Sequence, residues 1–184
     1  QDFLHPNPNI NSQAFLILRK EFENTFMDNL LANLKEEDLL IRRKSILALG
    51  RFGEKTLNSI VPLYINTNNR TVKVSCLKTM IKVVVNFNLN ELNKDEMIVV
   101  NLALKDCAPE VILSVISLLR QLGDAGRNIL MKTCRDKNLL KAKASISALL
   151  EMKDQNVDDL FDELLNDKSI DPMIIDDILR DKNL

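Results

Sequence analysis

The chain has 184 residues, of which 46% are hydrophobic and 28% charged, so it is long enough to bury a core and too apolar to be generally disordered. Aromatic residues make up only 4%, Trp is absent, and Gly (4) and Pro (5) are scarce, which argues against a strand-rich domain and favours helices. The net charge of −1 excludes a strong general attraction to nucleic acid or to an anionic membrane.

The charge is unevenly distributed along the chain. Residues 1–150 carry 21 Lys and Arg against 15 Asp and Glu, whereas residues 151–184 carry 4 against 11. We interpret the acidic end as the polar outer face of a terminal repeat. Two alternatives stay open, contact with a basic partner and head-to-tail self-association with another copy of the chain.

The three cysteines, Cys76, Cys107 and Cys134, form no CxxC motif, and their odd number indicates neither a disulfide framework nor a zinc site. We expect three buried thiols in a reducing compartment. No apolar run approaches the roughly 18 residues of a membrane span, and the first residues lack a signal-peptide pattern. The sequence therefore predicts an intracellular protein of the cytoplasm or the nucleus.

The N-terminal stretch QDFLHPNPNINS (1–12) contains two prolines and several asparagines, which break regular structure. It predicts an extended leader, and we assign residues 1–20 to this leader and the start of the first helix. The single histidine, His5, lies in it and is expected to be solvated rather than a metal ligand or a general base.

The next elements follow one repeated helical pattern. The run IRRKSILALGRFG (41–53) matches VILSVISLLRQLG (111–123) after a shift of 70 residues, and the final glycines coincide. VKVSCLKTMIKVV (72–84) and LKAKASISALLEM (140–152) fit the same template. A polar break precedes each run, and another apolar helical stretch precedes each break. The repeating unit is therefore helix A, a short polar turn and helix B.

Several helix boundaries carry their own signals. Asn93 and Glu96 have the spacing of a capping box, and Pro109 stands where a first-turn proline belongs. The stretch NFNLNELNKD (86–95), which contains this Asn93, predicts a longer loop between two repeats.

The C-terminal runs NVDDLFDELL (156–165) and DPMIIDDILRD (171–181) predict a last helical pair. A lone helical hairpin cannot bury its apolar faces, so neighbouring hairpins must stack to form a core. The predicted fold class is therefore all-α, with about five stacked hairpins. Their approximate boundaries are 21–54, 55–90, 91–124, 125–154 and 155–184.

The repeated pattern resembles HEAT repeats, in which an acidic turn, a branched aliphatic residue and a basic residue precede a small-apolar run ending in Leu-Gly. EEDLLIRRKSILALGRFG (36–53) carries this pattern, and KDCAPEVILSVISLLRQLGD (105–124) follows it without the basic residue. The compact period is also similar to the short HEAT-like repeats of phycobilin-lyase type, and armadillo repeats are an alternative. The resemblance covers about residues 21–184 and implies a right-handed α-solenoid whose B helices line the concave face.

Motifs that carry chemistry are missing from the sequence. It contains no phosphate-binding loop, dinucleotide fingerprint or nucleophile elbow. The adjacent acids Asp158/Asp159 and Asp176/Asp177 point in different directions on a helix, so we interpret them as solvated surface. The sequence predicts no catalytic residue, no metal, no cofactor and no enzymatic activity.

The basic residues of the B helices are the stronger functional lead. They are expected to form a discontinuous ridge on the concave face, and the candidates are Arg42, Arg43, Lys44, Arg70, Lys73, Lys78, Lys82 and Lys141, with Lys143 beside the last. Three interpretations stay open: a groove for an acidic peptide or domain, a track for nucleic-acid phosphates, and cations that only decorate exposed helix faces.

We therefore predict a non-enzymatic scaffold or adaptor that holds a protein partner on this face, within a larger complex. A nucleic-acid-binding helical-repeat protein and a regulatory subunit of a larger enzyme complex are the alternatives. Nucleic acid is disfavoured because we expect almost no exposed aromatic residues for base stacking and the chain has no net positive charge.

Overall fold

The computed structural model describes residues 5–152, 162, 165–166, 172–173 and 175–176. All regular secondary structure in this part of the chain is helical, which confirms the all-α class. The last predicted helical pair, 156–165 and 171–181, falls for the most part outside the described residues.

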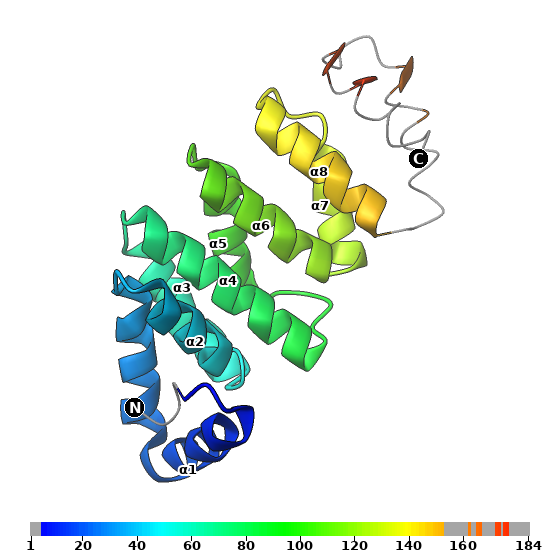
Figure 1. Cartoon of the computed structure of the whole chain (residues 1–184). Coiled ribbons are helices and arrows are strands. Elements are labelled where there is room, and N and C mark those ends of the chain that lie inside the picture. The colour runs from blue at the N-terminus through cyan, green and yellow to red at the C-terminus, as the bar shows by residue number, and fades with distance from the viewer. Residues whose placement is uncertain (1–4, 153–161, 163–164, 167–171, 174, 177–184) are drawn as a thin grey trace. The chain divides into compact units, whose positions relative to one another are not determined.

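The chain divides into two compact units, Gln1–Asn88 (unit 1) and Leu89–Leu184 (unit 2). Unit 1 contains helices α1 (Pro8–Ala32), the short 3-10 helix η2 (Asn33–Lys35), α2 (Leu39–Leu49), α3 (Glu54–Ile65) and α4 (Arg70–Phe87). Unit 2 contains α5 (Lys94–Leu104), α6 (Pro109–Gln121), α7 (Asp124–Thr133) and α8 (Leu139–Glu151) (Figure 1).

The N-terminal leader is shorter than the extended stretch predicted for residues 1–12, because α1 already begins at Pro8. The side chain of Asn7 caps the helix by accepting a hydrogen bond from the amide of Asn9 at 2.9 Å. Proline suits the first helical position, since its fixed φ matches the helix and its missing N–H would have no partner there. Asn7 and Pro8, which were predicted to break regular structure, therefore start a helix. Phe22, at φ −140° and ψ 37°, later interrupts it.

An aromatic cluster holds the first part of α1 in unit 1. The rings of Phe15, Phe26 and Phe52 pack edge to face, with centroids 5.3–6.0 Å apart, and all three are buried. The guanidinium of Arg51 lies over the Phe15 ring, 4.0 Å from its centroid. These contacts tie α1 to the turn that follows α2, and α1 packs against α2.

Helices pack in the A–B pairs expected from the sequence. In unit 1, α3 packs against α4, and in unit 2, α5 packs against α6 and α7 against α8. The capping box of Asn93 and Glu96 is confirmed, as is the first-turn position of Pro109. Neighbouring B helices also lie side by side, α2 against α4 in unit 1 and α6 against α8 in unit 2 (Figure 1). A continuous right-handed solenoid of about five hairpins stays a prediction.

The 70-residue sequence repeat is also a structural repeat. The helices α2, α3 and α4 correspond in order to α6, α7 and α8. Gly53 precedes α3 at φ 68° and ψ −137°, and Gly123 precedes α7 at φ 58° and ψ −132°. The caps of the last helices also match, because the side chains of Asn69 and Asn138 each accept a hydrogen bond from the amide three residues ahead.

Alanine at these two glycines should destabilise the protein by different amounts. Both positive φ values lie in a region that favours glycine, so each substitution should cost about 1–3 kcal/mol of unfolding free energy. At Gly53 a Cβ would also lie 3.0 Å from Cζ of Phe87, whereas at Gly123 it would meet nothing within 4 Å. Urea unfolding should therefore show a larger loss for Gly53→Ala than for Gly123→Ala. Asn90→Ala, in an exposed loop, is the control, and equal losses at the two glycines would contradict the proposed role of Phe87.

Candidate functional site

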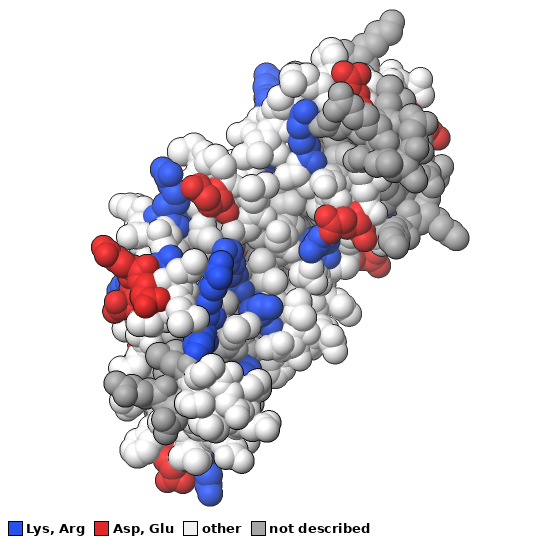
Figure 2. Space-filling model, viewed as in Figure 1, with Lys and Arg blue, Asp and Glu red and all other residues white. Residues whose placement is uncertain are grey.

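The face of unit 1 formed by α2 and α4 is rich in cations and has no acidic residue of its own. The two helices carry seven Lys and Arg and no Asp or Glu: Arg42, Arg43, Lys44, Arg70, Lys73, Lys78 and Lys82. Lysine and arginine side chains gather over these helices in the space-filling view (Figure 2). Cations clustered on two adjacent helices that carry no carboxylate create a positive potential that attracts anions.

Two of these cations are engaged in local structure. Arg42 donates hydrogen bonds from its guanidinium to the backbone carbonyls of Glu36 and Glu37, so it holds the turn before its own helix. The ammonium of Lys73 lies 5.7 Å from the ring centroid of Tyr64 on α3, which ties it to the partner helix of its hairpin.

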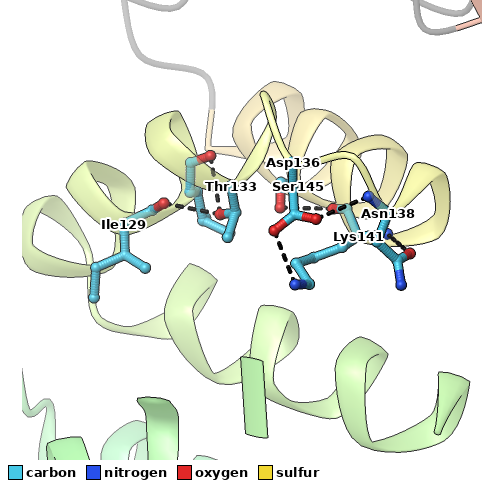
Figure 3. Close-up of polar contacts among 7 residues, drawn as sticks. Ile129, Thr133, Asp136, Asn138, Lys141 and Ser145 are labelled. Carbon is cyan, nitrogen blue, oxygen red and sulfur yellow. Dashed lines mark hydrogen bonds and ion pairs between the residues drawn. The ribbon is translucent and has the colours of Figure 1, made fainter. Parts of the chain in front are cut away.

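Lys141 lies in unit 2, in the first turn of α8, and its side chain reaches back to the turn before that helix. Its ammonium forms an ion pair with Asp136 at 2.9 Å, and only 12% of its side chain is exposed (Figure 3). Burial alone would raise the pKa of Asp136, but the hydrogen bonds from Lys141 and from the amide of Asn138 outweigh it and hold this pKa below its ordinary value. The charged group of Lys141 is thus engaged by the α7–α8 connection.

Five of the predicted cations keep their charged groups available. Arg43, Lys44, Arg70, Lys78 and Lys82 make no hydrogen bond or ion pair with any residue that the structure describes. Arg43, Arg70 and Lys78 are exposed, whereas Lys44 and Lys82 are half-buried. Because Lys78 and Lys82 are one helical turn apart on α4, they lie on the same face of that helix.

Close contact between α2 and α4 places the end of α2 directly beside Lys82. A Cβ at Gly50 would lie only 2.5 Å from Cβ of Lys82. The side-chain amide of Asn86 donates a hydrogen bond to the carbonyl of Gly50 at 2.8 Å. The sequence alone did not indicate either residue, because only the contact between the two helices gives them significance.

Apolar side chains accompany the cations along the outer side of α2. Leu40 and Leu47 are 60% and 52% exposed, and Arg43 stands between them at helical spacing. This side of α2 therefore offers hydrocarbon surface next to positive charge. Such a combination suits an anion with an extended apolar body better than it suits a small hydrated anion.

The corresponding face of unit 2 is nearly neutral. The guanidinium of Arg120 on α6 forms an ion pair with the carboxylate of Glu151 on α8. A shallow pocket of about 240 Å³ lies between these helices, lined by Leu113, Ile116, Ser117, Arg120, Ala144, Ser147, Ala148 and Glu151. The two units therefore share the arrangement of their helices but differ in the charge of the corresponding faces.

The cysteines differ from the prediction in one case. Cys76 and Cys134 are buried as expected, but Cys107 is exposed, so the expectation of three buried thiols is wrong. Cys107 follows the end of α5 in the short connection to α6, where hydrophobic periodicity no longer applies. Burial raises the pKa of the Cys76 thiol to about 12, which keeps it protonated.

His5 is exposed, and its Nδ1 accepts a hydrogen bond from the amide of Asn7 at 3.1 Å. Within the described residues, no group of three or more His, Cys, Asp or Glu is placed to hold a metal ion. A search of the same residues finds no helix with the length and apolar character needed to span a membrane.

Comparison with known proteins finds two similar over nearly their whole length, although no protein-family model matches the sequence. The chain is 25% identical over 175 residues to the uncharacterized phycocyanin operon protein Z of Pseudanabaena tenuis, which covers 95% of this chain and 87% of that protein. It is 30% identical over 167 residues to the bilin biosynthesis protein CpeZ of a Synechococcus species, which covers 88% of this chain and 90% of that protein.

These similarities correct several sequence-based predictions. The assignment to HEAT-repeat proteins is wrong, because the relatives carry the names of a different family. The prediction of a generic non-enzymatic scaffold, with nucleic-acid binding as its alternative, is also wrong, since one relative is named for a role in bilin biosynthesis. The predicted alternative of a nuclear location is not supported either, because the relatives are cyanobacterial and these cells have no nucleus. Helical periodicity reports how helices pack, and the same packing serves many chemistries.

Asp136→Asn should destabilise the protein at neutral pH and should not do so in acid. Because the folded-state pKa of Asp136 is lowered, its stabilisation is complete above the unfolded pKa of about 3.9 and is lost as the pH falls through the folded pKa. Urea unfolding at pH 7 should show a loss of about 1–2 kcal/mol, because Lys141 loses its ion pair. The loss should shrink as the pH falls below 4.

The control for this experiment is Asp28→Asn, which changes an exposed aspartate with no side-chain hydrogen bond or ion pair in the described part of the chain. It should alter stability little at either pH. An equal loss for Asp136→Asn at pH 7 and at low pH would show that the ion pair does not contribute.

Alkylation at neutral pH should distinguish the three thiols. Cys107 should react first with iodoacetamide in the native protein, because it is exposed, whereas buried Cys76 and Cys134 should react only after unfolding. Mass spectrometry of proteolytic peptides gives the site of labelling. Labelling of Cys76 at the rate of Cys107 in the native state would contradict the buried position of Cys76 on the inner side of α4.

Proposed function

The chain belongs to the family of the bilin biosynthesis protein CpeZ, and from this we propose that it takes part in bilin biosynthesis by binding the bilin on the α2–α4 face of unit 1. Bilins are open-chain tetrapyrroles with an extended apolar body and two propionate groups, which are anionic at neutral pH. The observation that carries the proposal is the set of seven cations, without a single carboxylate, on two helices that pack side by side.

The available cations suit the two carboxylates of such a ligand. In the proposed complex, Lys78 and Lys82 bind one propionate from the same face of α4, and Arg43 on α2 binds the other. Charge-assisted hydrogen bonds to carboxylates are about twice as strong as neutral ones. Arginine also offers a planar fork that matches a carboxylate, whereas lysine acts as a point charge.

The apolar side chains give the tetrapyrrole body its contact surface. Leu40 and Leu47 would be covered by the bilin, which removes exposed hydrocarbon from water. Holding the propionates and the body at separate points orients the ligand along the α2–α4 face. A fixed orientation is what any reaction at one end of a long conjugated ligand requires.

The proposal includes a protein partner and the wider architecture. We propose a bilin-carrying protein as the partner, in keeping with the name of the phycocyanin operon relative, and the cytoplasm as the location. We also retain the right-handed arrangement of about five stacked hairpins. The side-by-side B helices within each unit support it, and the five repeat ranges between residues 21 and 184 stay the proposed boundaries.

Titration with biliverdin, a bilin with two free propionates, tests the proposed site. The wild-type protein should change the absorption spectrum of biliverdin in a saturable manner, and the double variant Lys78→Glu/Lys82→Glu should bind roughly tenfold more weakly or worse. Each substitution removes an attraction to a carboxylate and adds a repulsion.

Two controls make this test specific. Lys94→Glu/Lys105→Glu changes the net charge equally but alters two exposed lysines at the ends of α5, so its affinity should stay close to that of the wild type. Biliverdin dimethyl ester, whose propionates are uncharged, should bind the wild-type protein more weakly than biliverdin does. Equal losses in the two double variants, or equal affinity for acid and ester, would exclude this site.

A further inference from the structure

Gly50 is required by the space around it and not by its backbone conformation. Its φ of −57° and ψ of −12° are accessible to any residue. A Cβ at this position would nevertheless lie 2.5 Å from Cβ of Lys82 and 3.4 Å from Nδ2 of Asn86. The absence of a side chain thus lets the end of α2 reach the backbone of α4 at Lys82.

Asn86 on α4 stabilises the same contact with the end of α2. It is a solvent-exposed residue one turn beyond Lys82, yet its side-chain amide donates to the carbonyl of Gly50 at 2.8 Å. This carbonyl lies at the C-terminal end of α2, where backbone acceptors have no partner within the helix. Gly50 and Asn86 together therefore determine where Lys82 stands relative to α2.

The structural repeat in unit 2 shows that this packing does not depend on a glycine. Arg120 lies 70 residues beyond Gly50, and Glu151 lies 69 residues beyond Lys82. At these corresponding positions α6 and α8 also pack together, but an ion pair between the two side chains occupies the contact. At the same place in the fold, unit 1 thus has Gly50 and a Lys82 that no described residue neutralises, whereas unit 2 has an arginine and a glutamate that neutralise each other.

We infer that Gly50 and Asn86 are positioning residues that hold Lys82 beside α2 for a ligand carboxylate, and that they make unit 1 selective for an anionic bilin. The inference rests on the proposed bilin-binding function. In unit 2 Glu151 neutralises the charge of Arg120, so that face does not attract a ligand carboxylate in the same way.

The measurement is the ratio of the dissociation constants for biliverdin dimethyl ester and biliverdin. A residue that only supports the fold would weaken both ligands together, whereas a residue that positions Lys82 changes the ratio. The variants are Asn86→Ala, which removes the hydrogen bond, and Gly50→Ala, which forces Lys82 away from α2. In both, the preference for the acid should fall roughly threefold or more relative to the wild type.

Two control variants separate positioning from stability. Asn128→Ala removes an exposed asparagine on α7 that makes no side-chain hydrogen bond in the described part of the chain. Ile146→Val makes a small cavity in the core of unit 2 and lowers stability by about 1 kcal/mol. Both should keep the wild-type ratio.

The outcomes distinguish this inference from the function on which it rests. A lower ratio in Asn86→Ala, with the controls unchanged, supports the inference even if Gly50→Ala fails to fold. A wild-type ratio in Asn86→Ala overturns it while leaving bilin binding at Lys78 and Lys82 in place. A wild-type protein that binds acid and ester equally overturns both.

Discussion

The side-by-side packing of neighbouring B helices is the interaction on which the rest of the structure depends. A single helical hairpin leaves one apolar face uncovered, and the next B helix covers it. Leu49, Leu77 and Met80 are fully buried in unit 1, as are Leu119 and Leu149 in unit 2. Because this packing is made by the inner sides of the helices, their outer sides form a surface whose residues are free to vary.

The two units show what this freedom permits. Corresponding helices, glycine turns and asparagine caps recur about 70 residues apart, yet one outer face is strongly cationic and the other is nearly neutral. Charged groups on an outer face contribute little to folding, so they can change without loss of the fold. The function proposed for this protein therefore depends on the surface of one repeat and not on the repeat itself.

Local features could be predicted from the sequence, whereas features that depend on tertiary context could not. Hydrophobic spacing located the helices, and short-range signals located the Asn93 capping box and the Pro109 start. The leader was predicted too long because Asn7 and Pro8 both break and begin helices. The family was wrong because a helical repeat pattern is shared by proteins of unrelated function, and similarity to relatives was needed to correct it.

The amino-acid sequence by itself determined the helices, the 70-residue repeat and the set of basic residues on the B helices. The tertiary structure decided which of these cations are available. Arg42 is bound to backbone carbonyls and Lys141 is paired with Asp136, whereas Lys78 and Lys82 on α4 make no hydrogen bond or ion pair within the described residues. The physical reason is that spacing along a helix fixes the direction of a side chain relative to its own axis. The partner that a side chain meets depends on how distant parts of the chain pack.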